Sequence, residues 1–119
     1  MKITESEWAV LDILWTKDSF ALGEITKELK AVNGWSKNTV YTYLTRMEQK
    51  GLVKIDRMYE KPYSAAVSKE ECARCERKEL LEKVYSGAAG DLIAAFLKES
   101  KISHEEVEKL KDMLDRMEV

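Results

Sequence analysis

Apolar residues recur at three- and four-residue spacing along most of the chain, which predicts a largely helical protein. A first helix is expected where Thr4-Glu-Ser-Glu7 has the S/T-x-x-E form of a capping box. Its apolar stripe contains Trp8, Leu11 and Trp15, which we expect to lie in the core. After an interruption the pattern resumes from Leu22 to Ala31, which predicts a second helix that packs against the first.

The stretch from Trp35 to Gly51 predicts a third helix, with Ser36 as its N-cap and Gly51 as its stop. The face of this helix that we expect to point outward is short, polar and nearly uncharged. Such a face can exchange hydrogen bonds with base edges, while threonine methyls suit thymine and an arginine suits phosphate or guanine. The inward face of this helix is expected to consist of Val40, Leu44 and Met47. The candidate DNA contacts on the outward side and its edges are Lys37, Asn38, Thr39, Tyr41, Thr42, Thr45 and Arg46.

Residues Leu52 to Val67 predict two short strands around a turn near Glu60 to Pro62. Three helices followed by such a ribbon are the element order of a winged helix-turn-helix. Near the tip, Arg57 and Lys61 are candidate contacts to DNA phosphates or to the minor groove, and the alternative is that they are solvated turn charges. The expected inward positions of the ribbon are Val53, Ile55, Tyr63 and Ala65.

A second capping box, Ser68-Lys-Glu-Glu71, marks the boundary between two predicted domains. Residues 1–67 are expected to form a winged-helix DNA-binding domain, and residues 68–119 a helical dimerisation domain. The fold class is therefore mainly α, a winged helix-turn-helix with a small antiparallel β-wing and a C-terminal helical region. Three short amphipathic helices cannot bury all their apolar faces alone. We therefore expect a homodimer whose contacts include Leu92, Ile93, Phe96, Leu97, Val107, Leu110 and Leu114.

Composition narrows the range of partners. A chain of 119 residues with 45% hydrophobic residues and one proline suits a single domain, or a domain with an appendage, folded throughout. It contains no apolar run of about 20 residues and no signal-peptide pattern, so we expect a cytoplasmic protein without membrane insertion. The net charge of −2 argues against a surface coated in positive charge, although residues 36–61 carry six basic and three acidic residues. Affinity for DNA is therefore expected to depend on two copies binding together.

The two cysteines, Cys72 and Cys75, form a CxxC one helical turn apart, which supplies two thiolates where a closed zinc site needs four ligands. Nearby glutamates raise a thiol pKa rather than activate it. We therefore favour packing for this pair, with no metal and no cofactor. The alternative is a metal- or redox-responsive repressor that senses through Cys72 and Cys75, with pairing across a dimer or His104 as an extra ligand. His104, in an exposed first turn, is more simply a solvated residue.

Catalytic motifs are absent from the sequence: it has no glycine-rich phosphate loop, nucleophile elbow or paired-carboxylate motif, so we do not expect an enzyme. A competing class is a winged-helix module that binds another protein through its third helix. The small polar residues of that helix favour DNA instead, because the core of a protein interface prefers aromatic or aliphatic anchors. Double-stranded DNA is therefore the expected partner.

Taken together, these residues resemble the penicillinase-repressor family, the BlaI/MecI/CopY-like winged-helix repressors. Ile3–Trp8 is similar to the family's first helix, Trp35–Val40 with Lys50–Val53 to its recognition helix, and Ser68–Cys72 to the start of its dimerisation region. The resemblance implies a dimeric transcriptional repressor that binds a palindromic operator, with a regulatory protease as a further partner.

Two departures from the family pattern concern induction. In the best-known members a membrane-bound sensor protease triggers cleavage at an Asn-Phe bond in the C-terminal half, whereas this sequence has Ala95-Phe96 in the matching place. Copper-responsive relatives end in a cluster of paired cysteines, which this sequence lacks. The wing segment is also a few residues shorter than is usual in the family.

Overall fold

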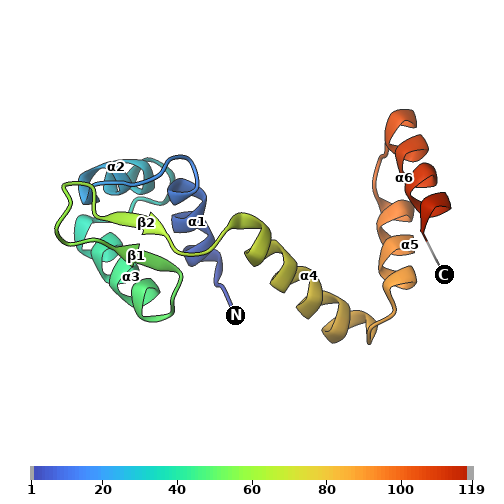
Figure 1. Cartoon of the computed structure of the whole chain (residues 1–119), viewed down its shortest axis with the longest axis horizontal. Coiled ribbons are helices and arrows are strands. Elements are labelled where there is room, and N and C mark those ends of the chain that lie inside the picture. The colour runs from blue at the N-terminus through green and yellow to red at the C-terminus, as the bar shows by residue number, and fades with distance from the viewer. Residues whose placement is uncertain (1, 118–119) are drawn as a thin grey trace. The chain divides into compact units, whose positions relative to one another are not determined.

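The computed structural model describes residues 2–117, which form six helices and one small sheet (Figure 1). The chain divides into two compact units, residues 1–77 and 78–119, each treated separately below. The elements in chain order are α1 (Glu5–Leu14), α2 (Leu22–Asn33), α3 (Lys37–Gln49), β1 (Val53–Ile55), β2 (Tyr63–Ala65), α4 (Lys69–Tyr85), α5 (Ala89–Glu99) and α6 (His104–Arg116). This order confirms the predicted fold class: a winged helix-turn-helix followed by further helices.

The helix starts follow from local capping. The Thr4 hydroxyl accepts from the backbone N–H of Glu7, whose carboxylate accepts from the backbone N–H of Thr4, so the predicted capping box is complete. The Ser36 hydroxyl caps α3 by accepting from the backbone N–H of Thr39. Before α3, Gly34 adopts φ 69°, a left-handed conformation that ends α2 and lets the chain turn at low steric cost.

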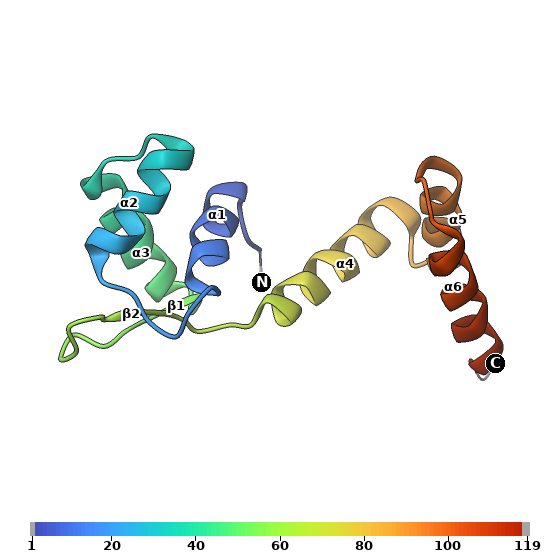
Figure 2. The same ribbon diagram turned by 90° about the horizontal axis from the view of Figure 1, so that it is seen from above.

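The core of the first unit lies between α1, α2, α3 and the sheet (Figure 2). Two aromatic pairs frame it: Trp8 and Trp15 meet edge to face at 5.6 Å, and Trp35 stacks on Tyr43 at 4.6 Å. Of the predicted inward residues, Leu11 and the three of α3 are buried, whereas Trp8 and Trp15 are only partly buried and pack against the core. Cys72 of α4 joins the same cluster. Fully buried members include Val10, Leu11, Leu14, Ile25, Leu29, Val40, Leu44, Met47, Leu52 and Cys72.

The sheet is a two-stranded antiparallel ribbon that packs behind α3. Val53 pairs with Ala65 and Ile55 with Tyr63, so the four predicted inward positions share one face. Backbone hydrogen bonds between Phe20 and Tyr63 add a single bridge from the segment before α2. The ribbon is therefore anchored to the helices along β2, and its loop, residues 56–62, forms the wing.

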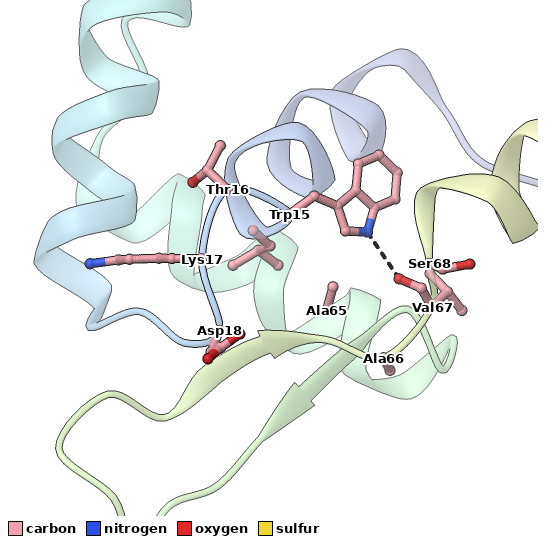
Figure 3. Close-up of a pocket in the computed structure, with 9 residues that line it drawn as sticks. Trp15, Thr16, Lys17, Asp18, Ala65, Ala66, Val67 and Ser68 are labelled. Atoms are coloured by element: carbon pink, nitrogen blue, oxygen red, sulfur yellow. Dashed lines mark hydrogen bonds between the residues drawn. The ribbon is translucent and has the colours of Figure 1, made fainter.

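The link from β2 to α4 is held by one backbone and one side-chain hydrogen bond: the N–H of Ala66 donates to the carbonyl of Leu52 at 2.9 Å, and Trp15 bonds to Val67. The indole N–H of Trp15 donates to the carbonyl of Val67 at 2.9 Å (Figure 3). A hollow of about 540 Å³ lies beside this bond, but Lys17, one of its lining residues, extends away from it toward α2 and pairs with Glu24. The Ser68–Glu71 capping box then starts α4 as predicted.

The boundary between units falls inside α4, after Arg77, rather than at its start. The first turns of α4 belong with the winged helix because Cys72 is buried in its core. The predicted assignment of residues 1–67 to DNA binding and 68–119 to dimerisation concerns function and stays a prediction.

Within residues 78–117 the second unit has no comparable core, and no residue of α5 or α6 is buried. Ser86 at φ 48° and Gly87 at φ 84° follow the last residue of α4 and end the helix. Most of the predicted dimer contacts are exposed, and two, Leu92 and Val107, are partly covered. The exposed ones are Ile93, Phe96, Leu97, Leu110 and Leu114.

Candidate nucleic-acid interface

The outward face of α3 is exposed as the sequence predicts, and its polar side chains gather around one shallow hollow. That hollow measures about 300 Å³, and its lining includes Asn38, Thr39, Thr42 and Arg46. The helix therefore brings four of the candidate DNA contacts together on one surface. Lys37 lies exposed in the first turn of the same helix.

A second hollow, of about 250 Å³, separates α3 from the wing. Tyr41 and Thr45 line it from α3, and Arg57 lines it from the wing, together with Ile55, Pro62 and Tyr63. Three more of the candidate residues thus meet at the junction of helix and wing. This junction is a feature of packing and could not be read from the helical pattern.

Two of the threonine hydroxyls are already bonded within α3. Thr42 donates to the carbonyl of Asn38 at 2.9 Å, and Thr45 donates to the carbonyl of Tyr41 at 3.0 Å. Each hydroxyl keeps lone pairs that can accept, and each side chain keeps its methyl group. These threonines can therefore offer a partner a hydrogen-bond acceptor and a methyl group, but no donor, because the hydroxyl proton is bonded to a backbone carbonyl of α3.

The cations around α3 fall into two groups. Within residues 2–117, Lys37, Arg46 and Lys54 make no ion pair. Lys54, exposed on β1, was not among the sequence candidates because nothing in the strand pattern sets it apart. These cations are available to an anionic partner.

The two wing cations are paired, which the sequence did not predict. Arg57 donates from both terminal nitrogens to the two carboxylate oxygens of Glu48 in α3, at 3.0 and 2.9 Å. Lys61 lies 3.7 Å from a carboxylate oxygen of Glu24 in α2. Neither cation is a free turn charge in this state.

A third ion pair anchors the end of α3 to the start of α1. Lys50 donates to both carboxylate oxygens of Glu7, at 2.8 and 2.9 Å, and to the carbonyl of Lys2 at 3.0 Å. Burial alone raises the pKa of Glu7, but the hydrogen bonds from Lys50 and Thr4 outweigh it, and the pKa lies below its ordinary value. Glu7 is the buried charged residue of the core, so this contact holds the recognition helix in place.

The cysteines lie apart from this interface. Cys72 is buried among core residues and Cys75 is partly covered. Burial, with Cys75 and nearby glutamates, raises the pKa of the Cys72 thiol, which disfavours the reactive thiolate. Within the described residues, no three His, Cys, Asp or Glu side chains converge as a metal site, and His104 lies exposed at the start of α6.

Comparison with known proteins places the chain in a family. The sequence profile of the family described as "Penicillinase repressor" matches residues 3–116. This chain belongs to the penicillinase repressor family. The "Methicillin resistance regulatory protein MecI" of Mammaliicoccus sciuri is 27% identical over 118 residues, 97% of this chain and 94% of that protein. The "Penicillinase repressor" of Staphylococcus aureus is 29% identical over 118 residues, 97% of this chain and 92% of its own.

Other similarities are weaker. The "Penicillinase repressor" of Bacillus licheniformis is 26% identical over 117 residues, covering 96% of this chain and 90% of its own. A MarR/EmrR family transcriptional regulator from Acinetobacter sp. ADP1 aligns with 97% of this chain and 78% of its own, at a TM-score of 0.42 and 18% identity. Among the described residues, no helix is both long and apolar enough to cross a bilayer.

Proposed function

We propose that this protein is a homodimeric transcriptional repressor that binds a palindromic DNA operator through α3. The observation that carries the proposal is the exposed polar face of α3, held on a winged-helix core in a chain of the penicillinase repressor family. Relatives named as repressors support a role in binding rather than catalysis. Of the nine residues singled out from the sequence, the seven on α3 form the proposed DNA surface, and the two wing cations, Arg57 and Lys61, flank it in pairs with carboxylates.

Sequence reading is assigned to Asn38, Thr42 and Thr45 on the outward side of α3. The Asn38 amide carries both a donor and an acceptor and can pair with the adenine edge. Thr42 and Thr45 can accept from base amino groups or pack their methyls on thymine, because their protons are bound to the backbone. Lys37 and Arg46, which make no ion pair within residues 2–117, supply contacts to phosphate, and Arg46 can also reach guanine.

Dimerisation is assigned to the second unit because its apolar side chains lack cover within one chain. Phe96 in α5 is 57% exposed and Leu114 in α6 is 60% exposed. Side chains of this size stabilise a fold only when removed from water. A second copy would bury both faces at once and would present two α3 helices to two half-sites about one DNA turn, or a multiple of it, apart.

Regulation by a protease is implied by the family resemblance alone. Ala95 and Phe96 both lie inside α5, where Ala95 is partly covered and Phe96 exposed. A peptide bond within a helix is accessible to a protease only after local opening. Induction by cleavage at this place therefore requires α5 to unfold locally first.

The test is a selection of random duplex DNA by the full-length protein. We expect an enriched palindrome whose half-sites are about one helical turn apart, or a multiple of it. Enrichment of a single half-site would contradict the dimer while retaining DNA binding. No enrichment, even at low salt, would contradict the proposal and favour the alternative of a protein-interaction module.

A further inference from the structure

Arg57, near the wing tip, is paired with a carboxylate of the same chain, Glu48. Both terminal nitrogens of Arg57 bond to Glu48, one to each carboxylate oxygen, in the parallel two-bond geometry that guanidinium and carboxylate favour. A phosphate group offers Arg57 the same two-oxygen geometry. Glu48 therefore occupies the donors that a DNA phosphate would need.

The pair lies at the edge of the proposed reading surface. Glu48 is one turn along α3 from Thr45, and Arg57 lines the hollow between α3 and the wing beside Tyr41 and Thr45. Any DNA backbone that follows α3 past the wing meets this pair. The net charge that the pair presents there is zero.

Stability does not account for the pair. The Arg57 side chain is 67% exposed and that of Glu48 is 30% exposed. Ion pairs with this much solvent exposure contribute little to the free energy of unfolding. The hydrogen bonds from Arg57 hold the pKa of Glu48 below its ordinary value, so the carboxylate is ionised at neutral pH. The main effect of the pair is that Glu48 neutralises the positive charge that Arg57 would otherwise present to DNA.

We propose that Glu48 is a positioning residue that holds Arg57 away from DNA phosphate and so weakens binding to DNA of every sequence. This inference rests on the DNA-binding function proposed above. Because phosphate contacts carry no sequence information, the restraint acts equally on operator and on random duplex. Base reading by α3 is left unchanged.

The chain contains a matched control. Glu70 and Arg77 of α4 form another exposed ion pair, at 2.8 Å, with side chains 64% and 60% exposed. Neither residue belongs to the proposed DNA surface. Glu70→Gln therefore removes the same charge from the same kind of pair without freeing a cation beside α3.

The experiment is a salt titration of binding to an operator and to a random duplex, with wild type, Glu48→Gln, Glu48→Gln/Arg57→Gln and Glu70→Gln. Glu48→Gln should tighten binding to both duplexes by about fivefold per protomer at low salt. It should also steepen the salt slope, the slope of the logarithm of the binding constant against the logarithm of the salt concentration, by about one per protomer. The double variant should match wild type, because it removes a pair that presented no net charge. Glu70→Gln should also match wild type.

A second variant guards against an indirect effect on folding. Arg57→Lys keeps the cation but loses the two-bond fork, so it should also steepen the salt slope, by a smaller amount. Thermal melting should be nearly the same for all variants, because the pair is exposed.

Three results would overturn the inference. A Glu48→Gln variant that binds DNA no more tightly than wild type would show that Arg57 stays out of reach of phosphate when freed. A double variant with a slope shallower than wild type would show that Arg57 already contacts phosphate. A double variant that keeps the gain would show that Glu48 acts through its own charge. Failure of wild type to bind any duplex would instead overturn the proposed function, and this inference with it.

Discussion

The two units of this chain bury their apolar residues to very different extents. The winged helix closes around side chains such as Leu11, Leu44 and Met47, which are fully buried. In the second unit the large side chains of α5 and α6, such as Phe96 and Leu114, stay exposed. A unit whose core is closed can fold alone, whereas a unit with open apolar faces needs another surface. The difference supports the proposal that the first unit folds independently and that the second unit forms the dimer.

Cutting the chain between the units is the most severe test of this difference. We expect residues 1–77 to fold as a monomer and the full chain to be a dimer at micromolar concentration. The cut belongs after Arg77 because Cys72 is part of the winged-helix core. Sedimentation measures both states, and a dimeric fragment or a monomeric full chain would refute the assignment.

Single truncations to alanine sharpen the same comparison. Leu11→Ala should lower the free energy of unfolding of fragment 1–77 by about 2–5 kcal/mol, because it leaves a cavity in a closed core. Leu114→Ala should instead weaken the dimer by about 1–3 kcal/mol, because the exposed Leu114 side chain is expected to be buried only in the dimer. Urea unfolding measures the first and sedimentation the second. Equal losses of monomer stability would remove the distinction between the units.

Acid should destabilise the first unit through its buried carboxylate. The folded-state pKa of Glu7 is below its ordinary value of 4.5, so its stabilising contribution is present above that pH and lost as the pH falls through the lower folded value. Glu7→Gln should lower the free energy of unfolding at pH 7 by about 1–2 kcal/mol and reduce this acid dependence. Urea unfolding of wild type and Glu7→Gln between pH 7 and pH 3 measures how the free energy of unfolding depends on pH. An unchanged acid dependence in Glu7→Gln would show that other groups control it.

The smallest effect is expected at Cys75, the partly covered member of the cysteine pair. Cys75→Ser should leave operator affinity unchanged, with or without zinc, copper or peroxide, because Cys75 lies outside the proposed DNA surface. Cys72→Ser should lower stability by about 1–3 kcal/mol, since it places a hydroxyl in the core. A metal or peroxide response that disappears in Cys75→Ser would favour the sensor alternative.

Much of the first unit was predictable because its determinants are local. The Thr4–Glu7 capping box joins residues three apart, and the inward positions of α3 follow from helical spacing. Alternation in the ribbon placed Val53 and Tyr63 correctly. In each of these, the sequence pattern that supports the prediction lies within a few neighbouring positions.

The contacts that the sequence did not reveal join different segments of the fold. Lys50 meets Glu7 across 43 residues, and Arg57 meets Glu48 across nine residues, with the turn after α3 and all of β1 between them. Charged surface residues have many candidate partners, and only packing selects one of them. The Ser68–Glu71 capping box marked the start of α4 correctly, but it did not show that Cys72 packs into the preceding unit, because a capping box determines where a helix begins and not where it makes its contacts.

The central claim is that α3 reads DNA sequence, and alanine at Asn38 or Thr42 tests it most directly. Operator and random duplex are titrated with each variant over a range of salt concentrations. We predict that operator affinity falls by about 1–3 kcal/mol while affinity for random duplex and the salt slope barely change, because base-edge contacts are lost and phosphate contacts are kept. Equal losses on both duplexes would contradict the claim and would transfer sequence reading to the wing or to DNA shape.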